Sequence, residues 1–140
     1  MDDLTARLVK HEGLEQSAYK DSLGYYTIGV GHMVDARLGG KLSISICMAI
    51  LAEDIAEARA DLANQSFYRY QSDVRKDALV ELCFAMGISK LLHFINMIAA
   101  LNVKDYQRAA DELLDSEWAR EVGITRASDV AHRIEYGRYN

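Results

Sequence analysis

The chain of 140 residues contains no proline, although proline makes up about 5% of an average protein. Proline breaks helices because it lacks a backbone N–H and its ring clashes with the preceding turn. Helices in this chain can therefore run uninterrupted, and we expect a mostly α-helical fold. Half of the residues are hydrophobic, which is enough for a sizeable core in one domain or in two small lobes that share a helix.

Apolar residues recur at helical spacing along most of the chain. Leu4 and Leu8 share one face of a first helix, which we expect to end before Gly13. A longer helix is expected from about Ser43, a good N-cap residue, to about Ala63. Further helices are expected over residues 73–86, 89–101 and 105–114, and from residue 125 onward.

The segment between the first two helices has a different pattern. Residues 17–20 and 25–28 read as short strands, and residues 22–24, which end in a glycine, read as the turn between them. We therefore predict an α+β fold that is mostly α, with one small β-hairpin.

Cysteine and charge exclude several classes of protein. Cys47 and Cys83 lie in helical patterns with apolar neighbours, so we interpret them as reduced core residues. The four histidines are scattered, which argues against a zinc site, and we expect no metal and no cofactor. The net charge of −5 argues against nucleic-acid binding, which requires a basic surface.

Candidate catalytic residues gather around the predicted hairpin. Glu12 ends the first helix, where an anion is electrostatically unfavourable, and Asp21 lies where a strand enters the turn. Thr27 lies on the returning strand, before two closely spaced glycines. A pair of carboxyl groups facing one another across a groove is what glycoside hydrolysis needs. From position alone, Glu12 is equally an ordinary helix-end glutamate. Thr27 has the alternative interpretation of a β-branched residue that favours strands.

The motifs resemble those of the phage-type lysozymes of the T4 endolysin family (glycoside hydrolase family 24). The resemblance is carried by His11-Glu12-Gly13-Leu14, Tyr19-Lys20-Asp21 and the run Gly24 through His32, read without a gap. Looser matches follow along the rest of the chain: Phe84-Ala85-Met86-Gly87, Phe94-Ile95-Asn96, Ser116-Glu117-Trp118 and Arg126-Ala127.

This resemblance implies a lysozyme-like, two-lobed fold. The small β lobe would span about residues 13–42, and a connecting helix would span 43–63. The helical lobe would comprise residues 64–140 together with 1–12.

The resemblance also implies roles for individual residues. Catalysis would rest on Glu12 as the general acid, with Asp21 and Thr27 holding the attacking water. The implied substrate-binding residues are Gly31, Met33 and Phe84. The implied supporting residues are Arg126, which would reach Glu12, and a pair formed by His32 and Asp54.

The expected activity is that of an endolysin, a muramidase that hydrolyses the β-1,4 bond between N-acetylmuramic acid and N-acetylglucosamine in peptidoglycan, with inversion at the anomeric carbon. Two alternatives remain: a non-catalytic glycan-binding or virion-associated module, and a lytic transglycosylase. The presence of Glu12, Asp21 and Thr27 together argues against both.

The expected partner is the glycan strand of peptidoglycan, without nucleic acid and without stable membrane insertion. No signal peptide is visible, so we expect a cytoplasmic product that a separate holin-like pore releases to the cell wall. We expect a monomer, with Ile46 and Ile50 as a possible weak self-association patch, because both lie off the apolar stripe of their helix.

Overall fold

The computed structural model describes residues 2–20, 26–29, 32–33 and 42–140, with side chains for residues 2–14 and 42–140. The chain divides into two compact units, Met1–Glu57 and Ala58–Asn140. The described residues are mostly helical, as the absence of proline predicts. None of the helices among them is both long and apolar enough to cross a membrane.

The first helix, α1, spans Asp3–Glu12 and has a clear signal at each end. The Asp2 carboxylate caps its N-terminus by accepting a hydrogen bond of 2.7 Å from the backbone N–H of Thr5. Gly13 caps its C-terminus with a φ of 78°, a conformation that strains any residue with a Cβ. The helix therefore ends at Glu12, as predicted.

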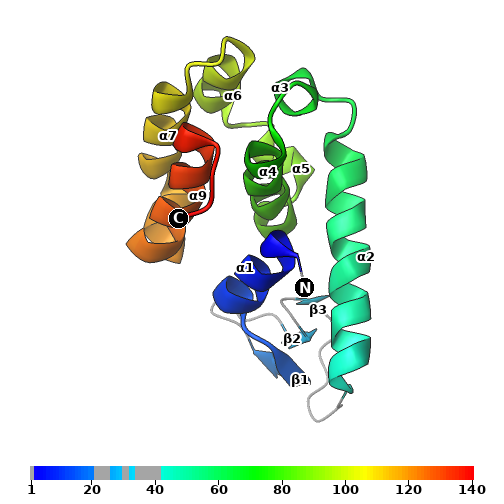
Figure 1. Cartoon of the computed structure of the whole chain (residues 1–140). Coiled ribbons are helices and arrows are strands. Elements are labelled where there is room, and N and C mark those ends of the chain that lie inside the picture. The colour runs from blue at the N-terminus through cyan, green and yellow to red at the C-terminus, as the bar shows by residue number, and fades with distance from the viewer. Residues whose placement is uncertain (1, 21–25, 30–31, 34–41) are drawn as a thin grey trace. The chain divides into compact units, whose positions relative to one another are not determined.

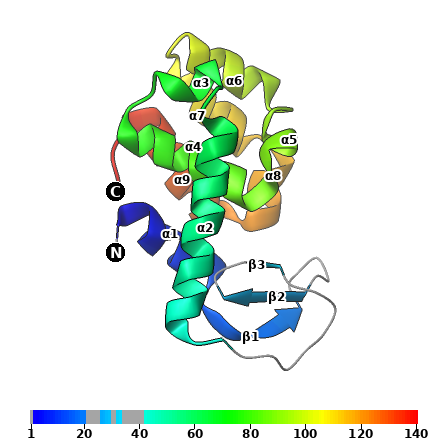
Figure 2. The ribbon, with the colours of Figure 1, turned by 90° about the vertical axis from the view of Figure 1, so that its right-hand side faces the viewer.

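Three short strands follow α1 and form one antiparallel sheet in the order β1-β2-β3 (Figure 2). Their bounds are Glu15–Lys20, Tyr26–Gly29 and His32–Met33. β1 and β2 overlap the two strands predicted from the sequence, with Tyr19 opposite Thr27 and Lys20 opposite Tyr26. The predicted turn at 22–24 lies outside the described residues.

The helix α2 spans Ile44–Leu62, close to its predicted bounds. Ser43 caps it, because its hydroxyl accepts a hydrogen bond of 3.3 Å from the N–H of Ile46. Residues at helical spacing along one face are buried: Cys47, Leu51, Ile55, Ala58 and Leu62. Ile44, in the first turn at the end of this apolar stripe, is 53% exposed.

Seven further helices lie in the second unit, which is called the helical unit. They are α3 (Ser66–Arg69), α4 (Asp73–Met86), α5 (Ile88–Leu91), α6 (Ile95–Asn102), α7 (Tyr106–Leu114), α8 (Glu117–Val122) and α9 (Ile124–Tyr136). α9 packs against α4, α7 and α8, and Figure 1 shows it beside α4 and α7. The core of this unit therefore forms around α9, whose Ala127, Val130 and Ile134 are fully buried.

One predicted helix is broken in the structure. The apolar stretch 89–101 was expected to form a single helix, but α5 ends at Leu91 and α6 begins at Ile95. The backbone N–H of Ile95 donates to the carbonyl of His93 at 2.9 Å, which closes a tight turn instead of a helical one. The break leaves Ile95 72% exposed, so the apolar pattern alone was misleading here.

The end of the chain is attached to α4 through side chains. Arg75 donates to the backbone carbonyl oxygens of Ile134 at 2.7 Å and Glu135 at 2.8 Å, which satisfies acceptors in the last turn of α9. Its guanidinium stacks on the ring of Tyr106 at 3.5 Å from the centroid. Tyr139 donates to the Asp77 carboxylate at 2.8 Å. These contacts hold α9 in place against α4.

Both cysteines are buried and reduced, as predicted. Cys47 lies on α2 and Cys83 on α4. Each therefore acts as a small apolar core residue.

Candidate active site

Glu12, the proposed general acid, is the last residue of α1 and is half-buried. A helix carries partial negative charge at its C-terminus, which disfavours a second negative charge there. Glu12 is followed immediately by the Gly13 cap and then by β1, which begins at Glu15. The fold therefore fixes this carboxyl group at a junction between a helix and a sheet.

For most of the other predicted catalytic and binding residues, the side chain lies outside the described residues. Thr27 lies on β2, opposite Tyr19 on β1 and Met33 on β3, and its side chain is outside the described residues. The side chains of His32 and Met33 are outside them too. Asp21 and Gly31 lie outside the described residues entirely. The roles assigned to these residues therefore stay predictions.

Besides Glu12, three predicted site residues have described side chains on helices: Asp54, Phe84 and Arg126. Phe84 lies near the end of α4, three residues before the Gly87 cap, and is half-buried. Asp54 lies on α2 and is also half-buried. The predicted pairing of Asp54 with His32 stays a prediction, because it involves a side chain outside the described residues.

Arg126, near the start of α9, is held by a carboxylate on α4. Its Nε donates to Glu81 Oε2 at 3.2 Å, and its guanidinium carbon lies 5.8 Å from the centre of the Trp118 ring. The side chain of Glu81 is fully buried, whereas that of Arg126 is 13% exposed. Arg126 therefore stands at the edge of a buried polar cluster. The expectation that it also reaches Glu12 stays a prediction.

A second arginine of α9 completes this cluster. Nη2 of Arg133 donates to Glu81 Oε1 at 2.5 Å and to Asp129 Oδ2 at 3.3 Å. Arg133 is fully buried, and Asp129 is nearly so. Its Nε and Nη1 are buried without a hydrogen-bond partner among the described residues. Buried ionic groups require partners of opposite charge, and these two arginines are such partners for the carboxylates of Glu81 and Asp129.

Comparison with known sequences identifies the family. Residues 9–134 match the profile of the family described as "Phage lysozyme". The chain belongs to the phage lysozyme family. Its function is accordingly that of a lysozyme of the endolysin kind, a hydrolase that acts on peptidoglycan.

Individual relatives agree with this assignment. The endolysin of Salmonella phage P22 is 37% identical, over 77% of this chain and 76% of the relative. Probable T4-type lysozyme 1 of Dictyostelium discoideum is 26% identical, over 92% of this chain and 91% of the relative. A third relative, the pre-baseplate central spike protein Gp5 of Enterobacteria phage T4, is 25% identical over 93% of this chain but only 27% of its own length.

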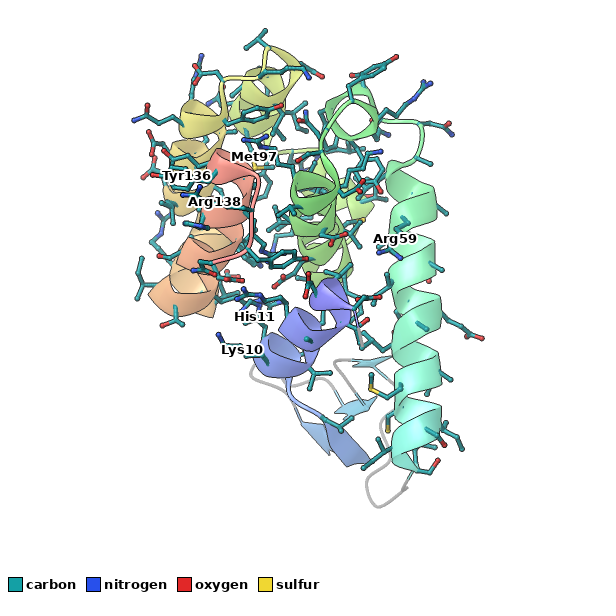
Figure 3. All side chains as sticks on the ribbon, in the orientation of Figure 1. Lys10, His11, Arg59, Met97, Tyr136 and Arg138 are labelled. Carbon is teal, nitrogen blue, oxygen red and sulfur yellow. The ribbon has the colours of Figure 1, made fainter. Side chains whose placement is uncertain are left out.

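The helical unit of this phage lysozyme also contains a pocket of about 390 Å³. Its walls come from α5, α6, α7 and α8 and from the turns before α6 and before α8. They include buried Met97 and Trp118 (Met97 is labelled in Figure 3). Three carboxylates, Glu112, Asp115 and Glu117, also line it. Phe84 is not part of its lining. No residue of this pocket was singled out for binding by the sequence analysis.

The buried cluster of Glu81, Asp129 and Arg133 was also missed. A signal for it existed in the sequence of α9, where Arg126, Asp129 and Arg133 recur at spacings of three and four residues. That spacing places charged side chains on one helix face beside the apolar residues of the core. A buried, charged face requires a partner of opposite charge on a neighbouring helix, and α4 supplies Glu81.

Proposed function

We propose that this phage lysozyme cleaves the β-1,4 bond between N-acetylmuramic acid and N-acetylglucosamine by single displacement. Glu12 protonates the glycosidic oxygen as the bond to the anomeric carbon breaks. Asp21, with the Thr27 hydroxyl, holds the attacking water and takes its proton. Because the water approaches from the face opposite the leaving oxygen, the configuration at the anomeric carbon inverts.

The observation that carries this proposal is the position of Glu12. It is half-buried at the C-terminal end of α1, and the strand pair β1–β2, which bears Thr27, follows directly. A general acid must be held within hydrogen-bond reach of the leaving oxygen, and a half-buried carboxyl group at a junction between a helix and a sheet suits that role.

The remaining residues of the proposal support or bind. Arg126 contacts and orients Glu12, and His32 pairs with Asp54 on α2. Gly31, Met33 and Phe84 contact the sugar. For Arg126, support comes from its fixed position beside Glu81, with 13% of its side chain exposed. For Phe84, support comes from its half-buried position at the end of α4.

The proposal includes the lysozyme-like, two-lobed architecture. A small β lobe would span about residues 13–42, the connecting helix 43–63, and the helical lobe residues 64–140 with 1–12. The three-stranded sheet and the 19-residue helix α2 support this arrangement. The protein would act after release from the host cytoplasm through a separate pore.

The proposal also includes a monomer with weak self-association. Ile46 on α2 is 49% exposed, its neighbour Ile44 is 53% exposed, and Ile50 is half-buried. Exposed apolar side chains on one helix favour weak contact between copies. The self-association would be refuted if light scattering found no species larger than the monomer at high protein concentration.

Two assays test the function. Purified protein should reduce the turbidity of permeabilised Gram-negative cells, and a Glu12→Gln variant should not. Mass spectrometry of the released fragments should find reducing sugar ends. Ends of the 1,6-anhydro type would instead identify a lytic transglycosylase. Binding to peptidoglycan without new sugar ends would identify a glycan-binding module. A virion-associated role would then be the alternative function, because one relative is a spike protein.

A further inference from the structure

The pocket of the helical unit has an acidic wall that the proposed reaction does not use. Its volume of about 390 Å³ lies within the range of small-ligand sites. Glu112, Asp115 and Glu117 line it together with Lys90, so three carboxylates face one ammonium group and the net charge is −2 when His93 is neutral. Among the residues that the structure describes, none of these three carboxylates forms a hydrogen bond or an ion pair.

Two of these carboxylates are placed against the electrostatics of their helix. Glu112 lies in the last turn of α7 and Asp115 caps its C-terminus, and no basic residue lies in that turn. The C-terminal end of a helix carries partial negative charge, and two carboxylates three residues apart also repel one another. Residues that break a local rule often mark a functional site. A bound cation would offset both unfavourable effects.

The pocket wall also contains a hydrogen-bond donor without a partner. Trp118 lines the pocket and is only 5% exposed. Its indole N–H, which can only donate, forms no hydrogen bond with any residue that the structure describes. A buried donor without a partner is unfavourable. A ligand that brings an oxygen acceptor into the pocket would satisfy it.

An apolar strip completes the pocket. Phe94 and Ile95 line it at the break between α5 and α6, and the break leaves Ile95 72% exposed. The three carboxylates are not a set whose ligand atoms all lie within 4.8 Å of one another, as a shared metal ion would need. The matching ligand is therefore organic. It carries an ammonium group on an aliphatic chain, with a carbonyl oxygen near that chain.

We infer that this pocket binds the free side-chain ammonium group of an uncrosslinked peptide of peptidoglycan. A crosslink converts such an amine into an amide, which carries no charge. The acidic wall of Glu112, Asp115 and Glu117 therefore selects parts of the cell wall without crosslinks, and Trp118 donates to a peptide carbonyl oxygen. This inference rests on the proposed function, which supplies peptidoglycan as the ligand, and it names the part of the substrate that the helical unit recognises.

The test compares two soluble ligands on the whole chain. One is a disaccharide–peptide fragment of peptidoglycan with a free side-chain amine, and the other is the same fragment after N-acetylation. Calorimetry gives each Kd, and we expect the free amine to bind about 10-fold more tightly. Trp118 is the only tryptophan of the chain, so a change in its emission places the ligand in the pocket. Binding without such a change would contradict the inference.

Removal of the acidic wall should abolish the discrimination. The triple variant Glu112→Gln, Asp115→Asn, Glu117→Gln should bind the free-amine fragment about 10-fold more weakly than the parent. Its Kd for the acetylated fragment should change by less than about 2-fold. The amides keep the size of the side chains, and the loss of negative charge at the end of α7 does not weaken that helix.

The matched control is the triple variant Asp61→Asn, Asp111→Asn, Glu121→Gln. It changes the net charge equally, at three exposed carboxylates outside the pocket lining, and should keep the preference of the parent for the free amine. Equal Kd values of the parent for both fragments, or the same loss in both triple variants, would overturn the inference. Binding needs no bond cleavage, so an absence of new sugar ends would contradict the proposed function instead.

Discussion

The two units each place a glutamate on a helix, in opposite settings. Glu12 is half-buried at the C-terminal end of α1 in the first unit. Glu81 is fully buried in the middle of α4 in the second unit, with an arginine on each oxygen. Glu81 thus joins α4 to α9, whereas Glu12 lies at the junction of α1 and β1. In the proposed function Glu12 performs the chemistry, and Glu81 holds two helices together.

The largest effect should come from removing the acid. Glu12→Gln should lower the rate of cell-wall hydrolysis by about 10²- to 10⁴-fold, because an amide cannot protonate the leaving oxygen. The free energy of unfolding should change little, because the amide keeps the size of the side chain and can still form hydrogen bonds. Fragment release and urea unfolding, measured on the same preparation, check both statements.

Glu57→Gln is the control for this variant, because Glu57 lies exposed on α2. It should retain full activity. A loss of less than about 10-fold for Glu12→Gln would remove Glu12 from the role of acid.

The next largest effect should appear in stability, in the second unit. Arg133→Met removes a fully buried counter-ion of Glu81 and the hydrogen bond that Arg133 donates to Asp129. Breaking a buried ion pair on one side typically costs about 3–5 kcal/mol of unfolding free energy, and we expect a loss in that range from urea titration.

Arg108→Met, an exposed arginine on α7, serves as the comparison and should change stability by less than about 0.5 kcal/mol. If both variants proved equally stable, the buried cluster would contribute nothing to the helical unit, and the contrast between the two glutamates would be lost.

The sequence predicted those parts of the fold that local chemistry determines. Gly13 and Gly87 end α1 and α4, and Ser43 begins α2, because a cap depends on one or two adjacent residues. The break between α5 and α6 was missed. It has no glycine or proline at Leu92, His93 or Phe94 to mark it, so tertiary packing overrides the apolar pattern there.

The candidate site also contains residues that the local sequence reveals and residues that it does not. Glu12 was found because a short, gapless motif marks it and because its helix end is visible in the sequence. Glu81 was missed because its burial depends on Arg133, 52 residues later in the chain. One sequence does not reveal such a pairing between distant helices. Neither does it reveal a pocket built from four separate segments.

A smaller effect is expected at the end of the chain. Burial and a hydrogen bond to Asp77 raise the pKa of Tyr139 above its ordinary value of 10.0. Asp77 also lies 3.8 Å from Arg59, on the part of α2 that belongs to the helical unit (Arg59 is labelled in Figure 3). Tyr139→Phe removes the hydrogen bond and should lower the free energy of unfolding by about 1 kcal/mol at neutral pH.

The pH dependence of this difference has a definite sign. A raised folded-state pKa gives stability that is fully present below the unfolded value and is lost as pH rises through the folded one. The parent should therefore lose its advantage over Tyr139→Phe above about pH 10. Tyr136→Phe, at a ring that is 54% exposed, should show no such loss. A constant difference between parent and Tyr139→Phe across this range would contradict the account.

The most direct test of the central claim is the configuration of the first product. If Asp21 and Thr27 hold a water opposite the leaving oxygen, the two carboxyl groups must lie roughly 6.5–9.5 Å apart, and hydrolysis inverts the anomeric carbon. Proton NMR during early turnover, before mutarotation, should then detect the α-anomer first from the β-linked glycan. Accumulation of the β-anomer first would mean that Asp21 attacks the sugar directly, and it would contradict the roles proposed for Asp21 and Thr27.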